Sequence, residues 1–368
     1  MKTFDFIVVG GGTSGTVTTE KLVSQGHSVL LLEEGHKNRN PFLSMPAGWL
    51  TLLDGSPYLK FYKSTPQAQL NNRQHDIAQA KILGGGSSVN AMVYMRGKPS
   101  DYENWVKQTS DQRWGWESLL RNYKRLEGNQ RLSGDFHGKD GPIKVSDPGY
   151  VAKGSKLYIE AMQNLGLPYN DDFNDGDQYG VGLMQYTIGD LKRSDTVSTL
   201  IEPLINNKNL TIHLNSFVTK VIIENKKAVG VEVINKGKVE NFYGKEIILT
   251  AGSLVSPKIL MHSGIGDEIQ LNKHGIKVIQ KLPGVGKNLQ DHHEVPFISR
   301  AKKGYGYFKE DKGLRKIKNG IQYLLFKSGP VASTGVDCCS FLNPENILDK
   351  NNPSVKLYCV QIMYTDRD

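Results

Sequence analysis

Cysteine is scarce in this sequence: the three cysteines, Cys338, Cys339 and Cys359, all lie near the C-terminal end. An odd number without a framework spacing argues against a disulfide-stapled domain, so we expect free thiols in a reducing compartment. No group of cysteine, histidine and acidic residues has the spacing of metal ligands, and we expect no metal site.

Long apolar runs are also missing, which excludes a transmembrane segment. No signal peptide precedes residues 4–9, because that first apolar stretch is needed as a strand of the fold. We therefore predict a cytoplasmic protein, and peripheral membrane contact stays open. Repeats and low-complexity linkers are absent too, and 38% apolar and 23% charged residues fit a globular protein.

Positive charge is in excess but is not focused. The formal net charge is +9, yet the lysines form only small groups such as Lys226-Lys227 and Lys302-Lys303, with acidic residues between them. Nucleic-acid binding needs a basic stripe, so we expect no nucleic acid partner. A solvated surface explains the excess, with attraction of an anionic substrate or a membrane surface as the alternative.

Glycine, in contrast, is abundant, with 39 residues that gather in tight groups. The first group is Gly10-x-Gly12-x-x-Gly15, which follows an expected strand at residues 4–9 and opens an expected helix at 16–25. A second buried strand, residues 28–32, ends at Glu33. This strand–turn–helix–strand order is the dinucleotide-binding fingerprint.

Each part of the fingerprint has a physical role. Gly10 permits the tight turn, Gly12 lets the backbone approach a pyrophosphate, and Gly15 lets helix and strand pack closely. The N–H groups of Thr13 and Ser14 lie at the positive end of the helix and favour phosphate. Glu33 is placed to accept hydrogen bonds from the adenosine ribose, which disfavours NADP and leaves FAD and NAD open.

The second glycine group extends over residues 80–90 and reads Ala-Lys-Ile-Leu-Gly-Gly-Gly-Ser-Ser-Val-Asn. Here the sequence resembles the glucose–methanol–choline (GMC) oxidoreductase family, whose first signature it matches, and residues 252–266 match the second signature. Shorter matches support the resemblance: His137-Gly138, Gly141-Pro142, Arg193-Ser194, Val229-Gly230-Val231, Pro283-Gly284-Val285-Gly286 and residues 288–292. The resemblance covers the whole chain.

The length of 368 residues favours two domains. The resemblance implies an α/β fold (α+β overall): an FAD-binding Rossmann-like domain with a parallel sheet, and a substrate domain on an antiparallel sheet. We assign residues 1–150 and 206–298 to the first domain, and 151–205 and 299–368 to the second, which we expect to be incomplete at its C-terminus.

The resemblance also implies FAD as the cofactor. It further implies that the backbone of Val218 contacts the adenine. A second implied contact is with the pyrophosphate and the flavin ring, along a segment that contains Leu83, Gly84, Gly85, Asn90, Ala91, Met92 and Val93. Some choline oxidases bind FAD covalently through a histidine just before this asparagine. The sequence has Val89 there, so we predict non-covalent FAD.

The family's general base is a histidine near the C-terminus. None of the nine histidines fits that position, so no catalytic residue is named. We expect a fragment of a longer protein; a separately encoded remainder or an inactive product are the alternatives.

The implied activity is oxidation of an alcohol by hydride transfer to FAD, with a quinone or another non-NAD electron acceptor. The sequence does not distinguish a dehydrogenase from an oxidase. An FAD-binding module without turnover is the competing hypothesis. Arg300 stands where the choline branch has a glutamate, which favours a generic or anionic small alcohol over choline. Asp337 is a second candidate for substrate binding.

Overall fold

The structure is a computed structural model that describes residues 3–52, 55–292, 294–299, 301, 304–351 and 353–362. Arg300 and His293 lie outside the described residues. The chain forms two compact units: unit 1 comprises Met1–Arg39, Leu52–Val89 and Asp195–Val295, and unit 2 comprises Asn40–Thr51, Asn90–Ser194 and Pro296–Asp368. Both units are discontinuous in sequence, and residues 90–150, assigned above to the FAD-binding domain, fall in unit 2. The functional roles given to the two domains stay predictions.

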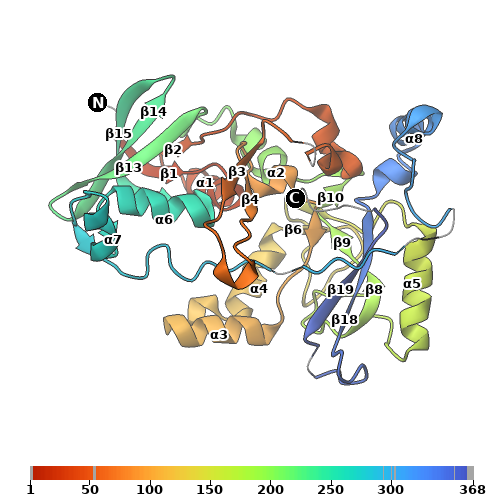
Figure 1. The fold of residues 1–368 in the computed structure, drawn as a ribbon. Helices are drawn as coiled ribbons and strands as arrows, with labels where there is room; N and C mark the ends of the chain where they lie inside the picture. Colours follow the sequence, from red (N-terminus) through yellow and green to blue (C-terminus); the bar gives the residue numbers. More distant parts are fainter. Residues whose placement is uncertain are drawn as a thin grey trace. The chain divides into compact units, whose positions relative to one another are not determined.

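Unit 1 is built on a six-stranded sheet in the order β12-β2-β1-β15-β14-β13 (Figure 1). Its strands are β1 (Thr3–Val9), β2 (Val29–Leu32), β12 (Leu210–His213), β13 (Ser216–Glu224), β14 (Lys227–Asn235) and β15 (Lys238–Leu249). The first four in spatial order, β12, β2, β1 and β15, run parallel, and β14 and β13 add an antiparallel extension. The parallel sheet expected for the first domain is therefore present.

Burial on both faces explains why the two central strands, β2 and the end of β1, are continuous apolar runs. All four residues of β2 are buried, and β1 ends in three buried residues. Successive residues of β1 and β2 pack into two different core clusters. Ile7 and Leu30 belong to one cluster, and Val8 and Leu31 belong to the other. The carboxyl ends of these strands are thereby held at one edge of the sheet.

The other elements of unit 1 are short. Its helices are α1 (Thr13–Ser24), α2 (Gly86–Val89), α6 (Gly252–His262), α7 (Glu268–Lys273), η3 (Ala68–Leu70), η5 (Val197–Ile201) and η6 (Glu202–Leu204), and its minor strands are β3 (Leu59–Lys63), β4 (Asp76–Ala80), β16 (Ile265–Gly266) and β17 (Gln280–Lys281).

Two local expectations were wrong. The sequence of residues 41–72 predicts an irregular connection, but β3 lies in that range and pairs with β4 in an antiparallel hairpin. The sequence of residues 196–206 predicts a single helix, but η5 is a π-helical turn and η6 a 3₁₀ turn. Pro203 has no N–H to donate to the turn before it, which explains the break.

Unit 2 contains a three-stranded antiparallel sheet in the order β19-β18-β8. Its strands are β5 (Val93–Tyr94), β6 (Glu127–Asn129), β7 (Ile143–Val145), β8 (Gly180–Leu183), β9 (Gln185–Tyr186), β10 (Ile188–Gly189), β11 (Lys192–Arg193), β18 (Val336–Leu342) and β19 (Val355–Val360). Its helices are η1 (Pro41–Ser44), most of η2 (Pro46–Leu52), α3 (Pro99–Thr109), η4 (Gln112–Trp114), α4 (Trp116–Leu126), α5 (Lys153–Asn164), α8 (Gly313–Phe326) and η7 (Pro330–Ala332). The mixed α/β class is confirmed.

A buried ionic cluster lies inside unit 2. Arg96 Nη2 is 2.7 Å from Glu127 Oε2, and His137 bridges Glu127 and Asp172 at 2.8 Å on each side. Burial opposes protonation of His137, but the hydrogen bonds to Asp172 and Glu127 outweigh it and raise its pKa to about 9. His137, which the sequence marked only as part of a short family match, is therefore a charged structural residue.

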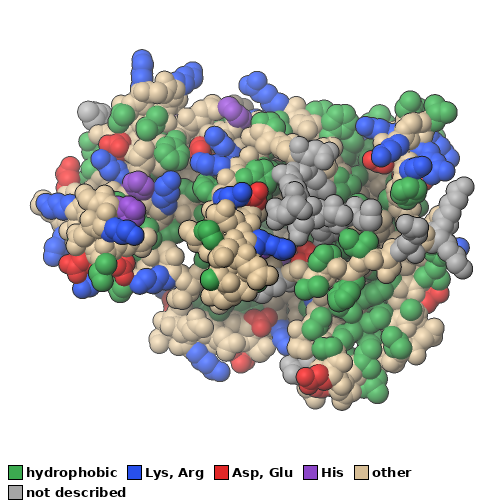
Figure 2. All heavy atoms as spheres, in the orientation of Figure 1, with side chains coloured by type: hydrophobic (Ala, Val, Ile, Leu, Met, Phe, Trp, Pro, Cys, Tyr) green, Lys and Arg blue, Asp and Glu red, His purple; other side chains and the backbone are tan. Residues whose placement is uncertain are grey.

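Two properties of the molecule bear on its partners: the length and polarity of its helices and the distribution of its basic side chains. Within the described ranges, every helix is too short or too polar to cross a bilayer. On the face drawn in Figure 2, lysine and arginine side chains occur in separate small groups, as the sequence pattern predicts. The absence of a nucleic acid partner and the cellular location stay predictions.

Candidate functional site

A cavity of about 680 Å³ lies in unit 1, at the carboxyl edge of the parallel sheet. Its wall includes the last residues of β1, β2 and β15 and the residues that follow them, such as Gly10, Glu33 and Thr250. In open α/β sheets, ligands bind outside the carboxyl ends of the strands. The fold therefore places the first glycine group where a ligand is expected.

The two glycine groups form one continuous wall. Gly84 donates its N–H to the carbonyl oxygen of Gly11 at 2.7 Å, and Ser87 donates its N–H to Thr13 Oγ1 at 3.2 Å. Gly85 adopts a φ of +52°, and a Cβ there would lie 2.6 Å from the Cα of Gly12. The close approach of the two backbones thus depends on glycine at position 85.

The glycines of the first group serve different purposes. A Cβ on Gly15 would lie 1.9 Å from the carbonyl oxygen of Gly10, so Gly15 is required by helix packing, as predicted. A Cβ on Gly12 would meet no protein atom closer than 3.9 Å, and one on Gly86 would meet none within 4 Å. Both residues line the cavity, and side chains there would fill space rather than clash with the protein. The open wall therefore fits a ligand that approaches the backbone.

Glu33 supplies the acceptor at the end of β2. Its carboxylate accepts hydrogen bonds from the N–H groups of Gly11 at 2.8 Å and Gly35 at 2.7 Å, and the residue is only 8% exposed. Burial raises the pKa of Glu33 to about 6, although the two backbone donors partly offset that effect. A carboxylate has about four acceptor sites, so capacity remains for hydroxyl donors of a ligand.

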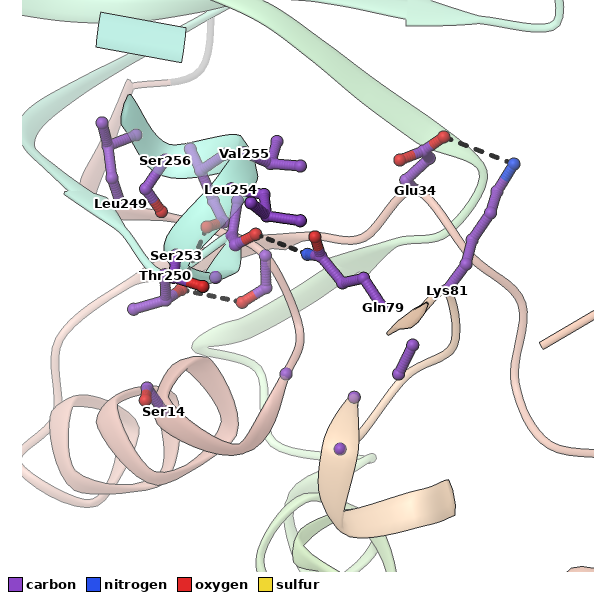
Figure 3. A pocket seen from close by; sticks show the side chains of 18 of the residues that line it. Ser14, Glu34, Gln79, Lys81, Leu249, Thr250, Ser253, Leu254, Val255 and Ser256 are labelled. Atoms are coloured by element: carbon purple, nitrogen blue, oxygen red, sulfur yellow. Dashed lines mark hydrogen bonds and ion pairs between the residues drawn. The ribbon is translucent and has the colours of Figure 1, made fainter. Parts of the chain in front are cut away.

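Two helix N-termini also reach the cavity. The first turn of α1 contributes Thr13 and Ser14, and the first turn of α6 contributes Ser253 (Figure 3). Neither helix has an acidic residue in its first turn or a side chain that caps its free N–H groups. Free N–H groups and the positive ends of the helix dipoles favour an anionic ligand such as a pyrophosphate.

Gln79 is a residue that the sequence did not single out. It lines the cavity from β4, and its Nε2 donates to the carbonyl oxygen of Ala251 at 2.8 Å (Figure 3). That bond fixes the orientation of the side-chain amide. Its Oε1 is buried and has no hydrogen-bond partner among the described residues, so a donor from a bound ligand would satisfy it.

Other parts of the wall were missed as well. Glu34 forms an ion pair with Lys81 at 3.3 Å (Figure 3) and another with Lys60 at 3.1 Å, so two cations accompany the carboxylate. Residues 250–256 also line the cavity. The sequence contains a signal for residues 250–256, because they follow a segment that reads as a strand and lead into the second family signature at residues 252–266.

The predicted cofactor residues fall into three groups. Gly10, Gly12, Thr13, Ser14, Glu33, Gly85 and Val218 line the cavity. Gly15, Leu83 and Gly84 are buried beside it and do not appear in its described wall. The remaining four, Asn90, Ala91, Met92 and Val93, belong to unit 2.

Asn90 forms a turn within unit 2. Its Oδ1 accepts from the N–H of Met92 at 3.1 Å and from Arg193 Nη1 at 2.8 Å. Met92 has a φ of +62° and a fully buried side chain in the core of this unit. Contact of residues 90–93 with a flavin stays a prediction.

Asp337 is a structural residue in this fold. It is 1% exposed, and its carboxylate accepts from Ser333 Oγ at 2.6 Å, Ser155 Oγ at 2.8 Å and the N–H of Ala152 at 2.9 Å. A carboxylate so fully engaged is a poor candidate for substrate binding. No histidine is among the described residues that line the cavity of unit 1.

The sheet, the glycine wall and the acidic residue after β2 define a dinucleotide-binding protein of the Rossmann type. The sequence model of the GMC oxidoreductase family matches residues 4–294, so the chain belongs to that family. It is 35% identical to an alcohol dehydrogenase [acceptor] of Pseudomonas putida over 95% of the chain, and to an oxygen-dependent choline dehydrogenase of Photobacterium profundum over 92%.

Solved structures of similar fold agree with this family assignment. A pyridoxine 4-oxidase from Mesorbium loti superposes with a TM-score of 0.83 and 29% identity over 97% of the chain. An Aspergillus oryzae formate oxidase gives 0.86 and 27% over 95%. The chain spans 64% and 60% of the two curated relatives and 66% and 63% of these two structures.

Proposed function

We propose that unit 1 binds FAD non-covalently in its cavity, and that the protein containing this chain oxidises the CH–OH group of an alcohol and passes electrons to a non-NAD acceptor. The observation that carries the proposal is the glycine wall. Gly12 and Gly86 leave space in front of the backbone that no protein atom fills, beside two uncapped helix N-termini. An FAD-dependent oxidoreductase from Chaetomium thermophilum has the same fold, with a TM-score of 0.83 at 29% identity.

Different residues of unit 1 would bind the pyrophosphate, the ribose and the adenine of the cofactor. Gly12, Thr13 and Ser14 would bind the pyrophosphate through backbone N–H groups, next to the turn at Gly10, whose own N–H donates to Leu32. Glu33 would accept from the ribose hydroxyls, and Val218 would meet the adenine. FAD supplies the acceptor for the hydride that leaves the alcohol carbon. The chain's own contribution is to orient the cofactor and to stabilise its phosphates with the positive ends of α1 and α6.

Non-covalent attachment is supported by the residue before Asn90. Val89 is the last residue of α2, and its aliphatic side chain has no atom that bonds to a flavin carbon. Acid precipitation of the purified protein tests this point. We expect all flavin absorbance in the supernatant; absorbance that stays with the pellet would show a covalent bond.

The activity needs a separate measurement. We expect alcohol-dependent reduction of a soluble quinone under nitrogen, and the yield of hydrogen peroxide under air then separates an oxidase from a dehydrogenase. A protein that holds FAD but reduces no acceptor with any small alcohol would contradict the proposed oxidation. It would favour the second candidate, an FAD-binding chain without turnover.

The substrate is proposed only as a class. The relatives are named for alcohol, choline, pyridoxine and formate, so their names do not agree on one compound. An arginine at position 300 suits a substrate with a negative charge rather than a quaternary ammonium. A panel comparing choline with hydroxy acids of similar size tests this, and faster turnover of choline would contradict it.

A further inference from the structure

Two of the three cysteines face each other across a pair of strands in unit 2. Strands β18 and β19 are neighbours in the sheet of unit 2 (Figure 1) and run antiparallel. In their register Cys338 lies directly opposite Cys359. Side chains opposite each other share a face of the sheet, with Cβ atoms about 4.5–5.5 Å apart. The Cα atoms of opposite residues are about 4.5–5.5 Å apart, which lies within the range of about 4.4–6.8 Å that disulfides span.

The two thiols are in direct contact and differ in exposure. Their side chains hydrogen-bond to each other. Cys338 is 0% exposed, and its sulfur also lies 3.6 Å from the carbonyl oxygen of Ser155 on α5, which covers this face. Cys359 is half-buried, so a small reagent reaches its sulfur first.

Hydrogen bonding makes Cys359 the thiol that ionises more readily. Its sulfur accepts from the Cys338 thiol and from Gln361 Nε2 at 2.9 Å, and these bonds lower the pKa of Cys359. The same bond to Cys359, together with burial, raises the pKa of Cys338. A thiolate reacts with peroxides, whereas a protonated thiol does not. The pair therefore combines an accessible nucleophile with a protected partner thiol.

Cys339 provides an internal comparison. It follows Cys338 along β18, so its side chain points to the other face, where Tyr358 is the opposite residue. It packs in a core cluster with Met92 and Phe173, and burial raises its pKa to about 12. Neither the other thiols nor solvent reach Cys339, which should stay reduced.

We propose that Cys338 and Cys359 form a peroxide-sensitive redox site that closes to a disulfide. The Cys359 thiolate attacks one oxygen of hydrogen peroxide, the O–O bond breaks, and a sulfenic acid and hydroxide form. The Cys338 sulfur then attacks the Cys359 sulfur, the S–O bond breaks, and water leaves with the Cys338 proton. Two thiols lose two electrons in total, and peroxide is reduced to water. This site is independent of cofactor binding in unit 1.

Thiol counting and peptide mapping test the proposal. The purified protein is treated with a small excess of hydrogen peroxide, free thiols are alkylated under denaturing conditions, and the peptides are mapped without reductant. We expect the count to fall from three thiols to one, with Cys338 and Cys359 linked and Cys339 alkylated. Reduction with dithiothreitol should restore all three.

Single substitutions assign the roles. Cys339→Ser should form the crosslink as the wild type does. Cys338→Ser should give a sulfenic acid on Cys359 that dimedone traps, and Cys359→Ser should form no crosslink. Because the mapping uses the wild-type chain, it stays decisive if a variant fails to fold. Peroxide that links Cys339, or that leaves all three thiols unlinked, would overturn the proposal.

Discussion

The N–H of Gly84 donates to the carbonyl oxygen of Gly11 at 2.7 Å, so two glycine groups far apart in the sequence form one wall of a cavity. This contact brings the first family signature, residues 80–90, beside the dinucleotide fingerprint within unit 1. Because Gly85 approaches Gly12 without side chains on either residue, the wall presents backbone to the ligand. Several consequences of this arrangement are measurable.

Gly12 and Gly15 should respond differently to the same substitution. In Gly12→Ala the new Cβ has room in the protein, so the free energy of unfolding should change by less than about 0.5 kcal/mol. The same methyl group stands where the ligand approaches, and the dissociation constant for FAD should rise at least about tenfold, a cost of about 1.4 kcal/mol. Thermal unfolding without ligand and an FAD titration check the two effects.

Gly15→Ala is the matched control for that variant. Its Cβ would fall 1.9 Å from the carbonyl oxygen of Gly10, and we expect overpacking to destabilise the ligand-free protein by about 1–3 kcal/mol. If Gly12→Ala loses stability as Gly15→Ala does and keeps its FAD affinity, Gly12 has a packing role only.

Gln79→Met should weaken FAD binding about tenfold, because it removes the buried acceptor Oε1, whose hydrogen bond to the ligand is worth about 1–1.5 kcal/mol. Gln74→Met serves as the control, since Gln74 is exposed and does not line the cavity. Equal affinity of the two variants, measured by quenching of flavin fluorescence, would show that Gln79 does not contact the cofactor.

The affinity for FAD should fall as the pH drops below about 6. The pKa of Glu33 is raised to about 6 by burial, so below that pH the carboxyl group gains a proton and loses acceptor capacity for ribose hydroxyls. Above about 6 the affinity should be level. In Glu33→Gln this pH dependence should disappear together with part of the affinity; a wild-type profile that stays flat from pH 5 to about 7 would exclude the predicted role of Glu33.

Stability should decrease at alkaline pH because of His137. Its pKa is about 9 in the folded protein against 6.5 ordinarily, so its stabilising contribution is complete below pH 6.5 and is lost as the pH rises through about 9. The total loss in the free energy of unfolding is about 3 kcal/mol, because each unit of difference between the two pKa values corresponds to about 1.4 kcal/mol. Urea unfolding between these pH values gives the measurement.

His137→Gln separates this effect from other titrations. The pKa values of Glu127 and Asp172 are lowered by their hydrogen bonds to His137 against the opposing effect of burial, so both carboxylates stay ionised throughout that window. The variant should be less stable at neutral pH and should lose the alkaline decrease. A variant with the same pH profile as the wild type would show that His137 is not the titrating group.

The sequence predicted those parts of the fold that local patterns encode. Residues 4–9 and 28–32 are continuous apolar runs with turn glycines between them, and they form β1 and β2 within one residue of the expected bounds. The cavity wall at Gly10–Ser14 and Glu33 followed from the same pattern, because the carboxyl ends of parallel strands meet at one edge.

Parts that depend on tertiary pairing were not predicted. Strand β3 has only five residues, too few for a clear periodic pattern, and it forms by pairing with β4 across the hairpin. Gln79 became a site residue through that hairpin and through its bond to Ala251, which is distant in sequence. Residues 90–93 illustrate the opposite case, since a motif continuous in sequence is divided between two compact units.

Titration of the flavin-free protein with FAD tests most directly whether the cavity of unit 1 is a cofactor site. We expect saturation at one FAD for each chain in the wild type, with weaker binding in Gly12→Ala and unchanged binding in Gln74→Met. NADP should not compete, because Glu33 repels a 2′-phosphate. Failure of the folded wild-type protein to bind FAD, or equal affinity of the wild type and Gly12→Ala, would contradict the assignment of this cavity.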